Sequence, residues 1–281
     1  MEQMIVRAAR DLIDSRYAIA LTGAGISTES GIADFRGPSG IWTRDPEAER
    51  RAYRSYERFL EDPRGWWKER LTGPSLLGDL EKVMPNPGHY ALAELEGMGI
   101  LKCVITQNVD GLHEKAGTKN LLEYHGSLLK FRCTSCVSRF GGDKFDLDRL
   151  MRENQLPPHC PKCGGIVKTD SVAFGEPIPA DVAQQSLEKA WKCDLMLVCG
   201  TSAVVYPFAN LPRVAMQKKE ERARKAGTGL STVEQIPAVT IIELNAEPTP
   251  LTEGGVSDYL IQGKTGDILP GIVEEVRRLR K

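Results

Sequence analysis

The sequence lacks long hydrophobic runs and carries almost no net charge. No apolar stretch approaches the ~18 residues of a transmembrane helix, and the N-terminal segment MEQMIVRAARDLIDSR has acids where a secretory signal would be apolar. Lysine and arginine total 37 against 38 for aspartate and glutamate, so overall charge does not attract the chain to nucleic acid or to anionic membranes. We therefore expect a cytoplasmic protein that makes no direct contact with nucleic acid or membrane.

The composition is that of an ordinary globular protein. Hydrophobic residues make up 41% of the chain and charged residues 27%, which supports a sizeable core and excludes a largely disordered chain. With roughly 150 residues per domain, the 281 residues predict about two domains, or one large fold with an inserted module.

Short apolar segments that end in glycine or small polar residues recur along the chain. Apolar residues at helical spacing precede the first of them, and Asn86-Pro87 gives a helix cap and a first-turn proline before the second. Apolar strands that alternate with helices indicate an α/β fold with a parallel sheet covered on both faces. Such sheets bind ligands at the carboxyl ends of their strands, so we expect one shared site there. The predicted strands are 17–22, 103–106, 195–199 and 239–244.

Four of the seven cysteines form two CxxC pairs, with 23 residues (137–159) between the pairs. This spacing is typical of ribbon-type zinc sites, and four thiolates leave no open coordination position, so we expect one structural zinc ion. The alternatives are reduced thiols without metal and a zinc ribbon that binds nucleic acid or protein. The paired cysteines are Cys133, Cys136, Cys160 and Cys163, while Cys103, Cys193 and Cys199 are expected as buried thiols.

The segment after the first predicted strand has the composition of a phosphate-binding turn. Gly23-Ala24-Gly25 lets backbone N–H groups approach a phosphate, although a plain tight turn has the same sequence. The sixth position of a dinucleotide fingerprint is Thr28, and no acidic strand end follows for the ribose, so a hydride-transferring dehydrogenase is not supported. We predict that 25–37 forms a flexible loop over the phosphate, in which Phe35 excludes solvent and Arg36 supplies a positive charge for the phosphate.

A histidine could act as a general base near the second strand end. The chain has only four histidines. His89 and His113 lie on helical patterns, where they could be structural, and His159 adjoins the zinc loop. His125 is the best candidate by position.

Several motifs occur together in one order: GAGISTESGIADFRG, TQNVDGLHEKAG, YHG, the paired CxxC motifs, VAFGE and GTSAVVYP. This combination resembles the sirtuin family of NAD-dependent protein-lysine deacylases over about residues 10–275. The resemblance implies a Rossmann-like lobe formed by 1–36, 80–130 and 170–281. A small domain, 37–79 and 131–169, would contain a helical part and the zinc ribbon.

The resemblance also implies a role for each matching residue. His125 would be the general base and Asn108 would share the catalytic site. Acyl-lysine would bind along Val172, Phe174 and Gly175. NAD would be consumed as a co-substrate and would be held by Gly23, Ala24, Gly25, Ser27, Glu29, Ile32, Phe35, Arg36, Gln107, Asn108, Asp110, Gly200, Thr201, Ser202, Asn245 and Thr265.

The implied activity is deacetylation of acetylated proteins, which gives free lysine, nicotinamide and 2′-O-acetyl-ADP-ribose. The alternatives are a mono-ADP-ribosyltransferase and a desuccinylase or demalonylase. Charged acyl groups are bound in this family by a Tyr-x-x-Arg pair, which is missing here, although Trp67 and Arg70 have its spacing.

Two further segments depart from the family pattern. Lys168-Thr169 replaces the usual Arg-Pro, and 217–235 is longer than usual. We expect the longer segment to be a solvated helix end followed by a mobile loop. The sequence gives no prediction of the oligomeric state.

Overall fold

The computed structural model describes residues 1–75, 77–227 and 239–281. The strands are β1 Ala18–Thr22, β2 Leu101–Thr106, β3 Leu121–Glu123, β4 Phe131–Cys133, β5 Arg139–Phe140, β6 Val167–Thr169, β7 Leu195–Cys199, β8 Thr240–Asn245 and β9 Tyr259–Gln262. The α-helices are α1 Glu2–Asp14, α2 Ile41–Arg44, α3 Pro46–Glu61, α4 Pro63–Thr72, α5 Pro87–Gly97, α6 Leu112–Lys115, α7 Leu147–Arg152, α8 Ala180–Lys192, α9 Leu211–Gly227, α10 Pro250–Glu253 and α11 Thr265–Leu279. The 3₁₀ helices are η1 Ala24–Ser30, η2 Gly142–Lys144 and η3 Phe208–Asn210.

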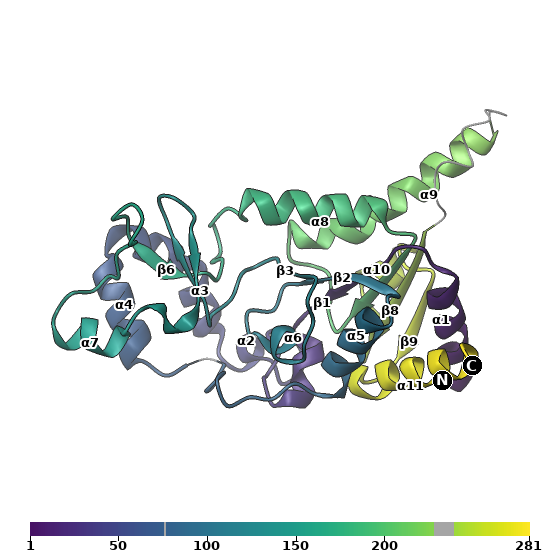
Figure 1. Cartoon of the computed structure of the whole chain (residues 1–281), viewed down its shortest axis with the longest axis horizontal. Coiled ribbons are helices and arrows are strands. Elements are labelled where there is room, and N and C mark those ends of the chain that lie inside the picture. Colours follow the sequence, from purple (N-terminus) through teal and green to yellow (C-terminus); the bar gives the residue numbers. More distant parts are fainter. Residues whose placement is uncertain (76, 228–238) are drawn as a thin grey trace.

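The molecule is elongated and has a larger lobe, which holds both termini, and a smaller lobe around α3, α4 and α7 (Figure 1). The larger lobe contains a six-stranded sheet in the order β3-β2-β1-β7-β8-β9, and all neighbouring strands are parallel. The strand order reverses between β1 and β7, where doubly wound sheets bind their ligands. The predicted α/β, Rossmann-like fold is confirmed.

Helices cover both faces of this sheet because its strands are buried on both sides. Ala18 and Ala20 of β1 join the core beneath α1, α5 and α11, while Ile19 and Leu21 join the core beneath α8 and α9. Successive side chains of a strand point to opposite faces, so an uninterrupted apolar run is what this sheet requires. All four predicted strands are present. The strand predicted at 195–199 matches β7, and the ends of the other three differ by at most two residues. The edge strands β3 and β9 were not predicted, because they are short and only partly buried.

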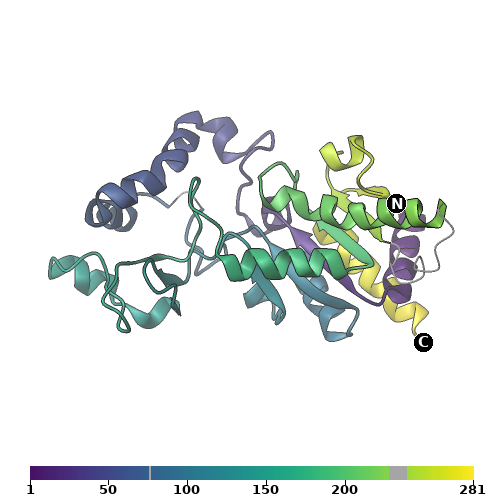
Figure 2. The ribbon, with the colours of Figure 1, turned by 90° about the horizontal axis from the view of Figure 1, so that it is seen from above.

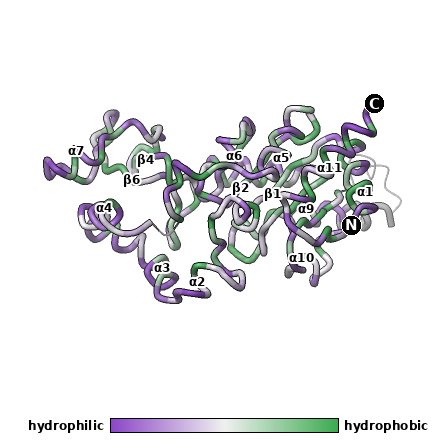
Figure 3. Tube along the Cα trace, turned by 90° about the horizontal axis from the view of Figure 1, so that it is seen from below, coloured by the Kyte–Doolittle hydropathy of each residue, from purple (hydrophilic) through white to green (hydrophobic). Residues whose placement is uncertain are grey.

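The smaller lobe combines helices with a three-stranded antiparallel sheet in the order β5-β4-β6. Seen from above, α3 and α4 form one arm of this lobe and the strands with α7 form the other (Figure 2). Helix α4 packs on the strands through Trp67, whose indole N–H donates to the carbonyl of Val167 at 3.0 Å. The tip around α7 is mostly hydrophilic (Figure 3).

Local sequence determines where the helices begin. The Asn86 side chain accepts from the Gly88 N–H and the Asn86 N–H donates to His89 Nδ1, which is the helix start that Asn86-Pro87 predicts for α5. Helix α9 accounts for the predicted helix end at 217–227, and the expected loop at 228–235 lies outside the described residues. Within the described ranges, no helix is both long and apolar enough to cross a bilayer.

Candidate active site

The ends of β1, β2, β7 and β8 lie side by side at one edge of the sheet. The register aligns Thr22, the last residue of β1, with Thr106 and with Cys199. The segments that follow these strands therefore meet at this edge, as predicted. Gly23, Gln107 and Gly200 directly follow β1, β2 and β7, and Asn245 is the last residue of β8.

Two glycines let the turns after β1 and β7 touch. The Gly25 N–H donates to the Gly200 carbonyl at 2.8 Å. A Cβ atom on Gly25 would lie 2.8 Å from that oxygen, and one on Gly200 would lie 2.3 Å from the Ile26 nitrogen. Gly200 also has φ +59, which favours glycine. The GAG and GTS turns thus form one backbone cradle.

Replacing Gly200 with alanine is expected to close this cradle. We expect the unfolding free energy to fall by about 1–3 kcal/mol more than in Gly99→Ala, because overpacking adds to the cost of positive φ. Gly99 is the matched control, since its φ is +72 but no atom lies within 4 Å of a built Cβ. Thermal melts and the KM for NAD measure the difference. Equal effects of the two substitutions would contradict a close-packed cradle.

The segment after Gly23 forms a 3₁₀ helix, which corrects the expectation of a flexible loop for its first part. Asn86 holds η1 from outside through Nδ2, which donates to the Ile26 carbonyl at 2.7 Å and to Ser30 Oγ at 3.1 Å. Glu29 accepts from the Gly266 N–H at 2.8 Å and ties η1 to α11. Asn86 was not predicted as a site residue, because its position as a helix cap already accounts for an asparagine there.

Three predicted site residues, one of which belongs to η1, are joined by hydrogen bonds. Asn108 Nδ2 donates to the Gly23 carbonyl at 3.0 Å and to Ser27 Oγ at 3.1 Å, and Ser27 Oγ donates to Asp110 at 2.7 Å. Burial raises the pKa of Asp110, while hydrogen bonds from Leu112 and Ser27 oppose the shift. Ile32 is buried against Leu112 and Leu80, apart from these polar contacts.

His125 follows β3 and faces the end of β2. Its Nδ1 lies 3.1 Å from the Gln107 carbonyl, which can only accept, so Nδ1 carries the proton. Burial lowers the pKa of His125 below the ordinary 6.5, against the opposing effect of the Gln107 hydrogen bond. The ring is therefore neutral at pH 7, and its Nε2 lone pair is available as a base.

The VAFGE segment lies directly beside His125. The Val172 N–H donates to the His125 carbonyl at 2.8 Å, and a Cβ on Gly126 would lie 1.9 Å from the Asp170 carbonyl. Gly126 has φ +68, so glycine permits both the turn and the approach. The structure thus brings a candidate base and the candidate substrate segment together.

A cluster of aromatic rings joins the residues that follow η1 to the VAFGE segment. Phe35 lies 4.8 Å from Trp42, which lies 5.7 Å from Phe174, and Phe174 lies 4.2 Å from Tyr53 (ring centroids). The Arg36 guanidinium lies over Trp42 at 4.4 Å. Trp42 and Tyr53 were not predicted, because they lie outside the motifs and nothing in the sequence pairs them with Phe174.

Buried ion pairs hold the VAFGE segment on the smaller sheet. Arg132 lies 3.1 Å from Asp170 and 2.7 Å from Glu176, and Lys168 lies 3.0 Å from the same Glu176. The second Glu176 oxygen also accepts from the Ala173 N–H at 3.0 Å. Lys168, noted as a departure from the family pattern, therefore has an ionic partner.

The remaining predicted contacts lie around β7 and β8. Thr201 Oγ1 accepts from Gln107 Nε2 at 2.5 Å, and Asn245 Nδ2 donates to the Thr201 carbonyl at 3.1 Å. Ser202 is exposed and Thr265 is buried. Within the described part of the chain, the Thr265 hydroxyl has no hydrogen-bond partner. An unpaired buried hydroxyl and a glycine cradle are features that a bound dinucleotide would satisfy.

The four paired cysteines form one cluster in the smaller lobe. Their Sγ atoms all lie within 4.8 Å of one another, with 3.5 Å between Cys133 and Cys163 and 3.7 Å between Cys136 and Cys160. Tetrahedral zinc with Zn–S bonds of about 2.3 Å places its sulfurs about 3.8 Å apart. The geometry thus fits one zinc ion held by four thiolates. His159 bonds the Gly164 carbonyl and is not in the cluster.

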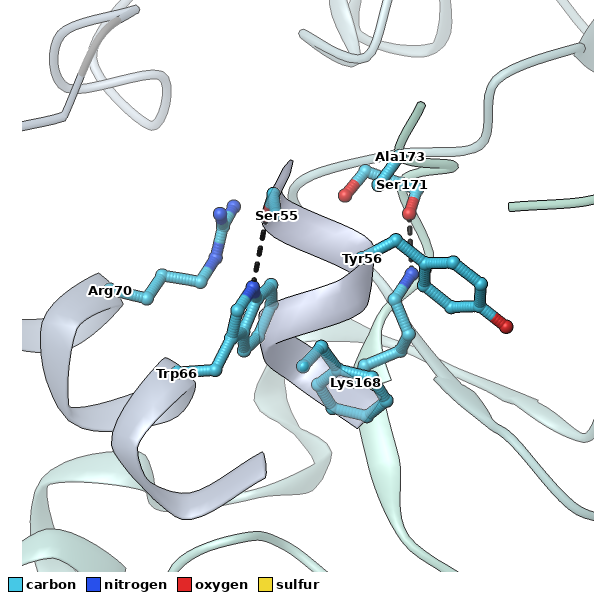
Figure 4. A pocket seen from close by; sticks show the side chains of 8 residues that line it. Ser55, Tyr56, Trp66, Arg70, Lys168, Ser171 and Ala173 are labelled. Carbon is cyan, nitrogen blue, oxygen red and sulfur yellow. Dashed lines mark hydrogen bonds between the residues drawn. The ribbon is translucent and has the colours of Figure 1, made fainter. Parts of the chain in front are cut away.

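Trp67 and Arg70 do not form a clamp, despite their spacing. Trp67 is 1% exposed and bonds Val167. Arg70 instead lines a pocket of about 50 Å³ between α3, α4 and the segment after β6 (Figure 4). The pocket is lined by Ser55, Tyr56, Phe59, Trp66, Arg70, Lys168, Ser171 and Ala173.

The doubly wound sheet with its glycine cradle, together with the four-cysteine module, defines a Rossmann-like nucleotide-binding protein with a zinc ribbon. A sequence model described as Sir2 family matches residues 23–207. The chain therefore belongs to the Sir2 family, and the predicted resemblance is confirmed.

Named relatives support the same assignment. The chain is 42% identical over 267 residues to NAD-dependent protein deacylase 2 of Pyrobaculum aerophilum. The aligned region covers 95% of this chain and 94% of that protein. It is similar to a solved Sir2 homologue–NAD complex, with TM-score 0.74 and 36% identity over 98% of this chain and 94% of that one. It is also similar to Sir2Af2 bound to a myristoylated histone peptide, with TM-score 0.62 and 36% identity over 100% and 99%.

Proposed function

We propose that the protein is an NAD-dependent protein-lysine deacylase. The observation that carries the proposal is the placement of His125. Its Nδ1 donates to the Gln107 carbonyl, its Nε2 has no hydrogen-bond partner among the described residues, and its carbonyl accepts from the Val172 N–H. In this proposal the base would stand between the sheet edge that binds NAD and the VAFGE segment that binds the peptide. When bound, NAD supplies an anomeric carbon that exchanges nicotinamide for the acyl oxygen of the substrate lysine.

The chain's own residues divide the binding work. The 23–25 and 200–202 turns would hold the diphosphate and the adenosine half, together with Arg36, Asn245 and Thr265. Gln107 and Asn108 would hold the nicotinamide ribose, and Asp110 with Ile32 would line the carboxamide pocket. Phe35 would exclude water from the reacting carbon. His125 Nε2 would accept a proton from a ribose hydroxyl, and Glu29 would fix η1.

Acyl-lysine proteins are the proposed partners. Val172, Phe174 and Gly175 would pair with the extended substrate backbone and line its acyl-lysine, which is strand addition to an exposed edge. The near-zero net charge of the protein supports binding of its substrate protein as a peptide, not through nucleic acid. The domain boundaries given above and a cytoplasmic location stay predictions.

An uncharged acyl group is the proposed substrate class. Trp67 is committed to Val167, so it cannot bind a carboxylate beside Arg70. The myristoylated peptide bound by the solved relative supports uncharged acyl groups that are longer than acetyl.

The test is incubation with NAD and acetyl-, butyryl- or succinyl-lysine peptides, followed by measurement of nicotinamide and peptide mass. We expect acyl loss only with NAD, one nicotinamide per lysine, and slower reaction of the succinyl peptide. Acyl loss without NAD would overturn the proposal. NAD consumption that modifies protein and leaves the peptide unchanged would indicate a mono-ADP-ribosyltransferase instead.

A further inference from the structure

Three polar side chains are buried together at the ends of β1 and β2. Thr22 is 0% exposed, Thr106 is 3% exposed and His113 is 1% exposed. The rest of these two strands is apolar except for Lys102. Apolar side chains would fill this place without the cost of desolvating two hydroxyls and an imidazole, so the presence of polar side chains here needs an explanation.

The three side chains form a chain of hydrogen bonds that ends at the Asn108 backbone. Thr22 Oγ1 donates to Thr106 Oγ1 at 2.8 Å, and Thr106 Oγ1 also accepts from the Asn108 N–H at 3.1 Å. His113 Nε2 lies 2.8 Å from Thr22 Oγ1. Since the Thr22 proton is already used, His113 Nε2 is the donor in that contact.

His113 suits this role because its ring is uncharged. Burial, with a smaller effect of neighbouring His89, lowers the pKa of His113 well below 6.5. A neutral imidazole carries one proton, and the geometry places it on Nε2. The ring therefore fixes the direction in which the Thr22 hydroxyl points.

The hydrogen bonds that begin at His113 end at the loop that carries the candidate site. The Gln107 N–H donates to the Thr22 carbonyl at 3.1 Å, so Thr22 and Thr106 bind consecutive backbone N–H groups. The carbonyl of the same Gln107 residue is the acceptor of the His125 Nδ1 proton. A shift of this backbone would move Gln107, Asn108 and the orientation of His125 together.

We propose that His113, Thr22 and Thr106 are positioning residues that fix the Gln107–Asn108 backbone and, through it, the His125 ring. The inference rests on the proposed deacylase function, in which these three buried residues would touch neither substrate. The chain is separate from the contacts of the Asn108 side chain, which go to Gly23 and Ser27. The hydrogen bonds that begin at His113 hold the backbone of the site rather than its side chains.

The test compares Thr106→Val, which removes the hydroxyl and keeps the shape, with Thr106→Ser, which keeps the hydroxyl. We expect Thr106→Val to lower kcat by about 10–100-fold, because small misplacements of reacting groups have effects of this size. The KM for the acyl peptide should change less than about threefold, since the VAFGE segment is held elsewhere. Thr106→Ser should keep kcat within about threefold of the parent.

Thr118→Val is the matched control. Thr118 is a buried threonine whose hydroxyl has no partner among the described residues, so its kcat should equal that of the parent. Thr22→Val breaks the same chain at another point and should lower kcat in the same way, which keeps the inference testable if Thr106→Val does not fold.

Two results would overturn the inference: parental kcat in folded Thr106→Val and Thr22→Val, or loss in Thr106→Ser equal to that in Thr106→Val. An inactive parent enzyme would instead contradict the proposed function itself.

Discussion

Replacing His125 with alanine is expected to lower kcat for deacylation by about 10²–10⁴-fold, the range that general-base catalysis contributes. The ring is neutral and half-buried, so its removal leaves no unpaired charge in the fold. We therefore expect an unchanged circular dichroism spectrum. Nicotinamide release and peptide mass would measure the activity. The Gly23 and Gly200 turns remain intact in the variant, so NAD should still bind.

The pH profile gives a second measure of the same residue. Burial lowers the pKa of His125 below 6.5, so half of the base is protonated only at a pH below this value. We expect the acid limb of kcat/KM to lie below this value and to disappear in the residual activity of His125→Ala. His159→Ala is the control, because His159 bonds Gly164 in the zinc ribbon, away from the sheet edge. A His125→Ala enzyme with parental kcat would require another base.

The sequence predicts best those features that a local pattern encodes. The apolar segments that end in glycine or amide residues predict the parallel sheet, because continuous apolar runs suit a sheet covered on both faces. The Asn86 cap and the two CxxC pairs are equally local, and the structure shows both. The shared edge of the strand ends followed from the geometry of parallel sheets rather than from any one residue.

Contacts between distant segments could not be predicted in this way. Arg132 and Glu176 are 44 positions apart, and each alone looks like a solvated charge. Thr22 and Thr106 look like ordinary strand ends until the register places them opposite each other. His113 was interpreted as structural from its helical position. The structure agrees that it is buried, but also connects it to the site.

The zinc ribbon and the substrate segment are connected through neighbouring residues of β4. Cys133 belongs to the metal cluster. Arg132 beside it holds Asp170, two residues before the VAFGE segment, and Glu176 at the end of that segment. Loss of the metal should therefore release this segment as well as the ribbon. The larger lobe has its own cores on both faces of the sheet and does not depend on these contacts.

Replacing Cys133 with alanine is accordingly expected to abolish zinc binding, unfold the smaller lobe and reduce deacylation to background, while NAD still binds. Structural zinc contributes about 10–16 kcal/mol of binding free energy that folding of such modules requires. Metal analysis, circular dichroism and calorimetric NAD titration would separate these effects. Cys103→Ala is the control, because Cys103 is buried in the large-lobe core, so this variant should keep both zinc and activity. A stable, active Cys133→Ala enzyme would show that the ribbon does not support the substrate segment.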